Sequence, residues 1–214
     1  SRRDLPIAVA RGEDGATTVA GTMIVAHLAG IRVLATGGIG GVHRGAPFDV
    51  SADLLELGRT PVAVVCSGAK SILDLPLTLE VLETQGVPVV GLGTDTLPAF
   101  YARSSGLPVD ATVKTAAEAA HIIAAAHRLD AQHGVIIAVT VPEADALPSE
   151  KMEEAIRRAT DEAAARNIQG KAVTPFLLAR VAELTGGASR RANIALLINN
   201  ARVAAEIAVA LAGL

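Results

Sequence analysis

The sequence predicts an α/β fold, with a mainly parallel sheet flanked by helices (α/β/α) and a helical C-terminal layer. Two observations predict it. Apolar, β-branched runs alternate with segments of helical period as far as residue 148, and helical segments without an intervening strand follow. Strands and helices in alternation produce a parallel sheet covered by helices. Half of the 214 residues are apolar, which is enough for the core of a single domain over residues 1–214.

The expected strands are short apolar runs that end at glycine or polar residues. Continuous runs of this kind suit strands that are buried on both faces. We expect strands at residues 6–10, 31–38, 60–68, 87–93 and 134–141.

The expected helices lie between these runs and after them. Residues 16–30, 71–86 and 115–131 have helical character, and Thr115 with Glu118 forms a capping-box pattern at the start of the third. Beyond residue 148 we expect helices at 149–167, 174–187 and 192–214. In the second of these, Thr174 is expected to be the N-cap and Pro175 the first helical residue, and Gly186 and Gly187 are expected to end the helix.

Composition excludes several classes of partner. A net charge of −3 and 2% aromatic residues provide neither a basic footprint for nucleic acid nor stacking platforms for bases. We expect no membrane span, which needs an apolar run of about 18 residues, and the first residues lack the order of a signal peptide. A single cysteine, Cys66, fits a reducing compartment. The chain is therefore expected to be cytoplasmic, without nucleic-acid or membrane partners.

Two polar stretches follow expected strands. Residues 35–58, ATGGIGGVHRGAPFDVSADLLELG, are expected to form a loop that places glycines near two aspartates, and CSGAKS at 66–71 follows the next strand. In an open parallel sheet, ligands bind outside the carboxyl ends of the strands. Glycine N–H groups can approach an anion closely. The pattern predicts a phosphate site.

Two familiar nucleotide motifs do not fit these stretches. His43 stands where the dinucleotide-binding fingerprint needs its third glycine, and Val64 and Ala69 stand where the phosphate loop of ATPases needs glycines. NAD and ATP are therefore not supported.

Simple structural interpretations stand beside the phosphate-site prediction. An isolated lysine such as Lys70 is most often a solvated surface charge, and Asp49 and Asp53 also suit loop caps. His43 suits a hydrogen bond to a loop carbonyl, and Cys66 suits a small core position. The other histidines considered show no ligand spacing, and two asparagines of the last helix suit packing or capping: His121, His127, His133, Asn199 and Asn200.

Three long stretches are similar to one known family. They run over residues 15–45 (GATTVAG to GGVHRG), 48–106 (FDVSAD through CSGAKS to ARSSG) and 170–211 (GKAVTP to IAVAL). They closely resemble the pseudouridine-5'-phosphate glycosidase family over almost the whole chain. The resemblance implies a lyase that reversibly splits pseudouridine 5'-phosphate into uracil and ribose 5-phosphate with a divalent metal, Mn²⁺ or Mg²⁺. It also implies a homotrimer whose partners are a sugar phosphate and a nucleobase-like aglycone.

The resemblance also implies roles for individual residues. Lys70 of GAKS matches the covalent nucleophile, and Asp49 of FDVSAD matches the metal ligand. The remaining matches are to substrate-contacting positions: Val19, Thr36, Gly37, Gly38, His43, Ser51, Ala52, Asp53 and Asn193.

These roles are chemically reasonable. A carbon–carbon glycosidic bond has no leaving-group oxygen to protonate, so hydrolysis by two carboxylates is poorly suited to it. A lysine imine with the opened ribose supplies an electron sink, provided that the amine is neutral. One carboxylate with waters is a usual environment for Mg²⁺ or Mn²⁺.

Three departures from the family pattern leave alternatives open. The chain is expected to lack an upstream third that carries the family's general-acid glutamate and a substrate-binding lysine. Pro47 stands where the family has Glu-His-Thr, and Val139-Thr140 stands where it has Asn-Pro. A C-glycosynthase that attaches ribose 5-phosphate to a non-uracil aromatic aglycone is one alternative, and a non-catalytic phosphosugar-binding module is the other.

Overall fold

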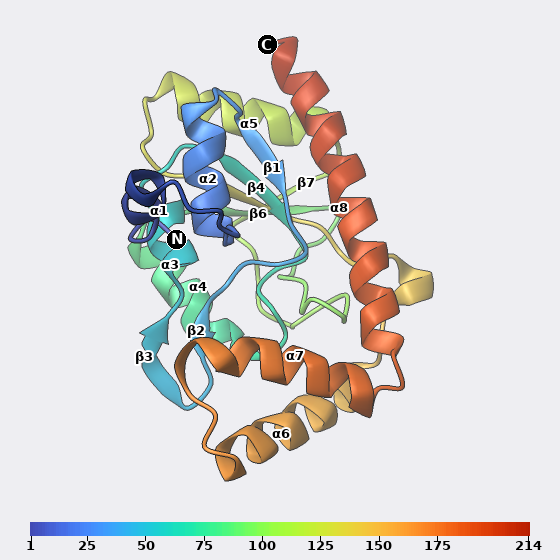
Figure 1. The fold of residues 1–214 in the computed structure, drawn as a ribbon. Coiled ribbons are helices and arrows are strands. Elements are labelled where there is room, and N and C mark those ends of the chain that lie inside the picture. Colours follow the sequence, from blue (N-terminus) through green and yellow to red (C-terminus); the bar gives the residue numbers. More distant parts are fainter.

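The central feature is a five-stranded parallel sheet (Figure 1). The computed structural model describes the backbone of all 214 residues and every side chain except those of Pro47 and Lys171. Pro47, which stands where the family pattern has Glu-His-Thr, therefore has a side chain outside the described part. The predicted parallel α/β sheet is confirmed. In spatial order the strands are β1 (Val33–Ala35), β4 (Ala63–Cys66), β8 (Val135–Ala138), β6 (Val89–Leu92) and β7 (Ala111–Val113).

The central strands β4 and β8 are buried on both faces, as their apolar sequences predict, whereas the edge strands β1 and β7 are partly exposed. In β4, Val64 and Cys66 belong to one core cluster, and Ala63 and Val65 belong to the other. Successive side chains of a strand point to opposite faces, so the apolar side chains of β4 pack alternately into the two core clusters on either side of the sheet. Burial raises the pKa of the Cys66 thiol to about 12, and the predicted core role of this cysteine is confirmed.

Helices cover the two faces and one end of the sheet. Side chains of α2, α3 and α4 pack in the first cluster, and those of α5 and α8 pack in the second. Figure 1 shows α6 and α7 together below the sheet and α8 running along its side, which confirms the helical C-terminal layer. The helices are α1 (Leu5–Arg11), α2 (Val19–Leu28), α3 (Ala52–Leu57), α4 (Leu75–Thr84), α5 (Ala116–Arg128), α6 (Ser149–Ala165), α7 (Val173–Leu184) and α8 (Ala188–Ala212), with short 3₁₀ turns at Glu143–Asp145 and Gly170–Ala172.

The strand predicted at residues 6–10 is wrong, because this segment forms α1. Pro6 lies in the first turn of the helix, where a missing N–H costs nothing, and Gly12 ends the helix with a φ of 64°. None of the residues of α1 is buried. The apolar run does not pair with the sheet, and the helix-start signal of Pro6 and the helix-end signal of Gly12 favour a helix.

The glycine-containing stretch 35–58 is more regular than the predicted loop. It contains a hairpin of β2 (Val42–His43) and β3 (Ala46–Val50), whose turn uses Gly45 at a φ of 70°, and then α3. β2 also pairs antiparallel with β5 (Leu73–Asp74), giving a second sheet in the order β3-β2-β5. Two-residue strands carry too little periodicity to be seen in a sequence. The edge strand β7 was not predicted either.

Helix boundaries were predicted with mixed success. The hydroxyl of Thr115 accepts a hydrogen bond from the N–H of Glu118 (3.2 Å), so the predicted cap of α5 is confirmed. The predicted cap of α7 is wrong: the helix begins at Val173 after Ala172, without a side-chain cap. Gly186 and Gly187 are left-handed, as expected for a helix end (φ 56° and 79°).

Helix α8 departs from the expectation that no segment could span a membrane. By length and composition it could cross one, with a mean hydropathy of 1.6 over its most apolar window, of which 33% is buried. In the structure, α8 packs against α5 and the sheet through Leu196, Val203, Ile207 and Leu211.

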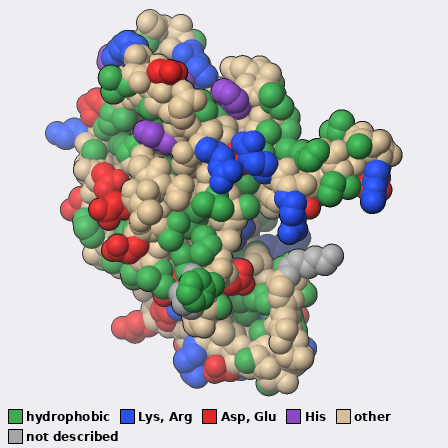
Figure 2. Space-filling model, turned by 90° about the vertical axis from the view of Figure 1, so that its left-hand side faces the viewer, with side chains coloured by type: hydrophobic (Ala, Val, Ile, Leu, Met, Phe, Trp, Pro, Cys, Tyr) green, Lys and Arg blue, Asp and Glu red, His purple; other side chains and the backbone are tan. Residues whose placement is uncertain are grey.

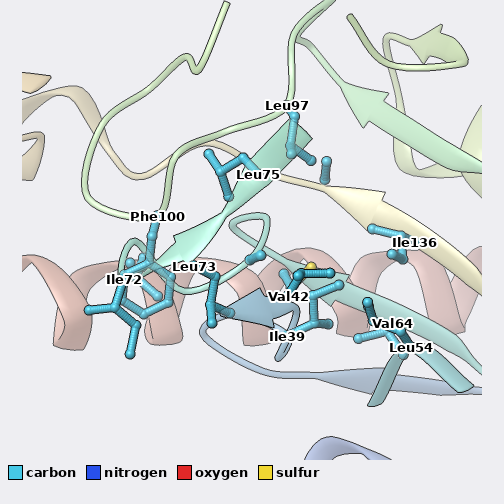
Figure 3. Close-up of a cluster of buried hydrophobic side chains, with 14 of the residues drawn as sticks. Ile39, Val42, Leu54, Val64, Ile72, Leu73, Leu75, Leu97, Phe100 and Ile136 are labelled. Atoms are coloured by element: carbon cyan, nitrogen blue, oxygen red, sulfur yellow. The ribbon is translucent and has the colours of Figure 1, made fainter. Parts of the chain in front are cut away.

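The first core cluster reaches the edge of the sheet at the carboxyl ends of its strands, which faces α7 in Figure 1. Figure 3 shows Phe100 from a loop beside Ile72, together with Ile39, Val42 and Leu73. On the face shown in Figure 2, acidic and basic side chains are interspersed with exposed apolar ones. The core thus extends directly beneath the predicted site.

Candidate active site

The glycine loop and the segment of Lys70 lie side by side. They follow β1 and β4, which are neighbours in the parallel sheet, so their carboxyl ends meet at one edge. The N–H of Ile39 donates to the carbonyl of Gly68 (3.1 Å), and the N–H of Lys70 donates to the carbonyl of Ile39 (3.1 Å). Two stretches that are 30 residues apart in the sequence thereby form one surface, as the strand-end rule predicts.

A cavity of about 280 Å³ opens over this surface. It gathers five of the predicted site residues: Thr36, Gly37, Gly38, Lys70 and Asn193. Larger hollows of about 480 and 610 Å³ lie at α4 and at α6, and neither holds a predicted site residue. Size alone does not identify the site here, because the predicted chemistry gathers in a smaller cavity. The other residues that line it are Phe100, Tyr101, Leu178, Ala182, Ser189, Arg190 and Leu197.

Two backbone donors in the cavity are available to a ligand. Gly37 and Gly38 are buried, and their N–H groups have no hydrogen-bond partner among the described residues. Most buried N–H groups in proteins are paired with protein or with ordered water. Unpaired N–H groups in a cavity that also contains a lysine can donate to an anion such as a phosphate.

The cavity is closed on one side by a strained aromatic residue. Phe100 has a φ of 63°, which is unusual for a residue with a side chain, and its N–H donates to the carbonyl of Ser67 (3.1 Å). A Cβ on Gly38 would lie 2.7 Å from the Phe100 ring, so this position must be glycine. Tyr101 packs edge-to-face on Phe100, with ring centroids 4.7 Å apart. Burial raises the pKa of Tyr101, against a hydrogen bond with Ser189 that lowers it.

Helix α8 supplies another part of the lining and supports the glycine loop. Asn193 lies close to Gly37, since a Cβ there would come within 3.3 Å of the amide oxygen Oδ1. Two turns further along α8, the side chain of fully buried Asn200 donates from Nδ2 to the carbonyl of Thr36 (2.9 Å) and to the hydroxyl of Ser67 (3.1 Å). The packing interpretation of Asn200 therefore holds, and its contact is directly beneath the cavity.

Asp53 is a structural cap in this structure. Its carboxylate, 3% exposed, accepts hydrogen bonds from the N–H of Ala20 (2.8 Å) and of Gly40 (2.8 Å). The first joins it to the first turn of α2, which Val19 begins, and the second joins it to the glycine loop. Ser51 caps α3 by accepting from the N–H of Asp53 (3.2 Å). Val19, Ser51, Ala52 and Asp53 thus form a second group, outside the cavity lining.

The hairpin β2–β3 carries the remaining predicted residues. His43 is half-buried and pairs with Leu73 and Ala46, and Asp49 is exposed on β3. Neither lines the cavity. Arg44 ties this hairpin to the turn after Lys70, because it donates to the carbonyls of Ser71 and Leu73 (both 3.1 Å).

The donor set around Asp49 fits only a loosely held cation. No group of three or more His, Cys, Asp or Glu side chains gathers anywhere in the part of the chain whose side chains are described. A closed metal cage is therefore not built from these residues. One exposed carboxylate fits a hard cation that keeps most of its waters.

Val139 and Thr140, where the family pattern has Asn-Pro, do not line the cavity. Val139 is buried in the core cluster of α5 and α8, and its N–H donates to the carbonyl of Cys66 (2.8 Å). The carbonyl of Thr140 is 3.4 Å from Nδ2 of Asn199. Neither residue is a lining residue, so the exchange alters packing beneath the sheet edge. It gives no support to a different aglycone.

Several lining residues escaped the sequence analysis. Phe100 and Tyr101 sit in an irregular segment after β6, and Arg190 and Ser189 begin α8. Nothing in the local pattern brings these segments to Lys70. One signal in the sequence could have found Phe100 and Tyr101. The chain has only three Phe and one Tyr in 214 residues, and these two are adjacent within the family-like stretch 48–106.

Comparison with known proteins shows the family of this chain. The family model described as "Indigoidine synthase A like protein" matches residues 1–210. A pseudouridine-5'-phosphate glycosidase of Methylobacterium nodulans is 59% identical over 215 residues, which cover all of this chain and 64% of that protein. One of Alkaliphilus metalliredigens is 56% identical, over 99% of this chain and 69% of that protein. The chain thus spans less than two thirds of the first of these relatives.

Solved structures of similar proteins have the same fold as this chain. The crystal structure of the prealnumycin C-glycosynthase AlnA in complex with ribulose 5-phosphate has a TM-score of 0.93 and 42% identity, covering 100% of this chain and 71% of that one. An indigoidine synthase A-like protein from Thermotoga maritima has a TM-score of 0.92 and 39% identity, covering 99% and 70%. The resemblance found in the motifs is confirmed, and the chain belongs to the indigoidine synthase A-like, pseudouridine-5'-phosphate glycosidase family.

Proposed function

We propose that this chain provides the ribose 5-phosphate half of a C-glycosidase site that reversibly joins ribose 5-phosphate and uracil. The observation that carries the proposal is the cavity itself: Lys70 shares it with the unpaired N–H groups of Gly37 and Gly38. A nucleophilic amine and an anion cradle are the two features that a sugar phosphate needs. Relatives that are 56–59% identical carry the corresponding name.

In this proposal Lys70 acts as an amine nucleophile. In the direction of synthesis, its neutral Nζ attacks the C1 aldehyde of open-chain ribose 5-phosphate, and the aldehyde oxygen leaves as water to give a protonated imine. The ring carbon of the aglycone then forms a bond to C1 and loses its proton, and the electron pair of the imine moves to nitrogen. The hydroxyl on C4 replaces the amine at C1, which closes the sugar ring and releases Lys70. Cleavage follows the reverse order and consumes the water.

The glycine loop has a positioning role in the same scheme. Its N–H groups at Gly37 and Gly38 hold the phosphate, and Thr36 is fixed by Asn200. Asp53 holds the other end of the loop through Gly40. Because both ends are anchored to helices, the loop needs little rearrangement when the ligand binds, which favours orientation of the reacting carbon.

A C-glycosynthase that uses an aromatic acceptor in place of uracil is the second candidate. One observation favours it: the structure of AlnA, named a prealnumycin C-glycosynthase, matches this chain at a TM-score of 0.93. Higher identity to the named pseudouridine-5'-phosphate glycosidases favours uracil. A non-catalytic phosphosugar-binding module is the third candidate, and an inert Lys70 would favour it.

We further propose that Asp49 supplies one oxygen ligand to Mn²⁺ or Mg²⁺, which would keep most of its waters at this exposed position on β3. We also propose a homotrimer and a cytoplasmic location. Exposed apolar side chains on one helix fit contact with further copies: Ile194 (51% exposed) and Ile198 (67%). Light scattering of the purified protein tests the assembly.

Reductive trapping tests the proposed function. Incubation of the full-length protein with ribose 5-phosphate and borohydride should attach the sugar phosphate to Lys70, as mapped by mass spectrometry of peptides. Lys70→Arg keeps the charge and should give no adduct. Lys151, an exposed lysine of α6, is the matched control, and Lys151→Arg should be trapped like the parent. An adduct on another lysine, or full activity of Lys70→Ala, would remove Lys70 from the mechanism.

A further inference from the structure

We propose that Arg190 binds an oxygen atom of the aglycone and thereby selects planar, oxygen-bearing rings as the partner of the sugar phosphate. The inference rests on the proposed function and adds to it the residue that recognises the second substrate. It starts from an asymmetry between the two walls of the cavity around Lys70.

The first wall is polar and made of backbone. It consists of Thr36, Gly37 and Gly38, with Lys70 beside them. The anchored loop leaves two free N–H groups there, so this wall suits the phosphate and the hydroxyl groups of a sugar.

The second wall has the composition of a site for a flat ring. Leu178 and Ala182 of α7 and Leu197 of α8 supply apolar surface, and the Phe100–Tyr101 pair supplies aromatic surface. Such a lining with a few polar groups is typical of sites for apolar or aromatic ligands. A phosphate gains nothing from these side chains, whereas a nucleobase or another aromatic ring can pack on them.

Arg190 is the charged group of this second wall. Its guanidinium makes no ion pair or hydrogen bond with any side chain that the structure describes, and no carboxylate is among the described residues that line the cavity. Arg190 and Asn193 are three residues apart on α8, so they lie on one helix face. Both line the cavity, and together they offer amide and guanidinium donors to the edge of a ring lying on the apolar wall.

The charge of Arg190 gives the contact a chemical consequence. A carbonyl or hydroxyl oxygen on a ring becomes more negative as the ring loses a proton and gains carbon nucleophilicity. A guanidinium that donates to this oxygen favours that form over the neutral one. The contact therefore selects against rings without an oxygen at that edge.

Steady-state kinetics of the full-length enzyme tests the inference with uracil and ribose 5-phosphate as probes. Arg190→Met should raise the KM for uracil about tenfold or more and should leave the KM for ribose 5-phosphate within about twofold. Arg191→Met is the matched control, since Arg191 is the next residue, exposed, and outside the cavity lining. It should change neither constant. An aromatic acceptor bearing a phenolic oxygen is the second probe if uracil is not a substrate.

Each other outcome overturns the inference. A raised KM for ribose 5-phosphate with an unchanged KM for the acceptor would assign Arg190 to the phosphate. Unchanged constants for both substrates would leave Arg190 without a binding role. If neither acceptor gives product or saturable binding while ribose 5-phosphate is still trapped on Lys70, the inference fails and the sugar half of the proposed function stands.

Discussion

The side-chain amide of Asn200 donates a hydrogen bond of 2.9 Å to the main-chain carbonyl of Thr36, 164 residues away in the sequence. Asn200 is fully buried, and its amide is also within 3.1 Å of the hydroxyl of Ser67. The last helix thus holds the ends of β1 and β4, from which the glycine loop and the Lys70 segment leave. One buried amide links the C-terminal layer to the candidate active site.

Replacement of this amide is expected to destabilise the protein. Asn200→Leu keeps the size of the side chain and leaves the part-buried carbonyl of Thr36 and the buried hydroxyl of Ser67 without this partner, so the free energy of unfolding should fall by about 1–3 kcal/mol. Urea denaturation measures it. Asn199→Ala serves as the control, because the Nδ2 contact of Asn199 is longer (3.4 Å) and its side chain is only partly buried. Equal stability of Asn200→Leu and the parent would show that the link is dispensable.

Glycine is required at position 40 for steric reasons. A Cβ there would lie 2.6 Å from Cβ of Ser51 and 2.9 Å from Oδ2 of Asp53. Gly40→Ala should therefore separate the loop from its cap and lower the free energy of unfolding by about 1–3 kcal/mol, with loss of ribose 5-phosphate trapping. Gly15→Ala, where a Cβ meets nothing within 4 Å, should be close to neutral. Trapping of the sugar phosphate by Gly40→Ala at the parental rate would contradict this account of the loop.

The pair of Arg44 and Glu153 should make stability depend on pH. The hydrogen bond and charge of Arg44 hold the pKa of Glu153 below its ordinary value of 4.5. The folded state therefore binds the proton less readily than the unfolded state, so the pair stabilises the protein above about pH 4.5, and this contribution is lost as the pH falls through the folded-state pKa.

Glu153→Gln should consequently lower the free energy of unfolding at pH 7 by about 0.5–1 kcal/mol, since the pair is largely exposed. The difference from the parent should become smaller at an acidic pH below the folded-state pKa of Glu153. Glu154→Gln breaks the pair with Arg157, which is exposed on α6, and should cost less. Urea denaturation at the two pH values measures the free energy of unfolding of both variants. A difference between Glu153→Gln and the parent that grows at acidic pH would contradict the prediction.

Binding of Mn²⁺ should require the carboxylate of Asp49 and no other exposed carboxylate. With Asp49 as the sole protein ligand that we propose, Asp49→Ala should abolish the binding of Mn²⁺ seen by titration calorimetry or electron paramagnetic resonance, and the fold should remain intact because Asp49 is exposed. Asp14→Ala, which removes another exposed carboxylate, is the control and should bind Mn²⁺ like the parent. Retained Mn²⁺ binding in Asp49→Ala would place the metal elsewhere.

The sequence was most informative where a local rule and the tertiary environment agree. The runs at residues 60–68 and 134–141 predicted β4 and β8, because a strand between two cores must be apolar on both sides. The meeting of the glycine loop with Lys70 also followed, because neighbouring parallel strands end at one edge. The run at 6–10 failed for the opposite reason: its apolar residues have no sheet to join.

The sequence by itself determined the family, the parallel α/β fold and the segments that carry Lys70, Asp49 and the glycines, since each is encoded in contiguous residues. Only the tertiary structure decided which of these residues share a cavity. It brought Asn193 to the glycine loop, left Asp49 and His43 on a hairpin outside, made Asp53 a cap, and added Phe100 and Arg190. The physical reason is that the walls of the cavity come from segments far apart in the chain, whose meeting depends on packing across the sheet and along α8.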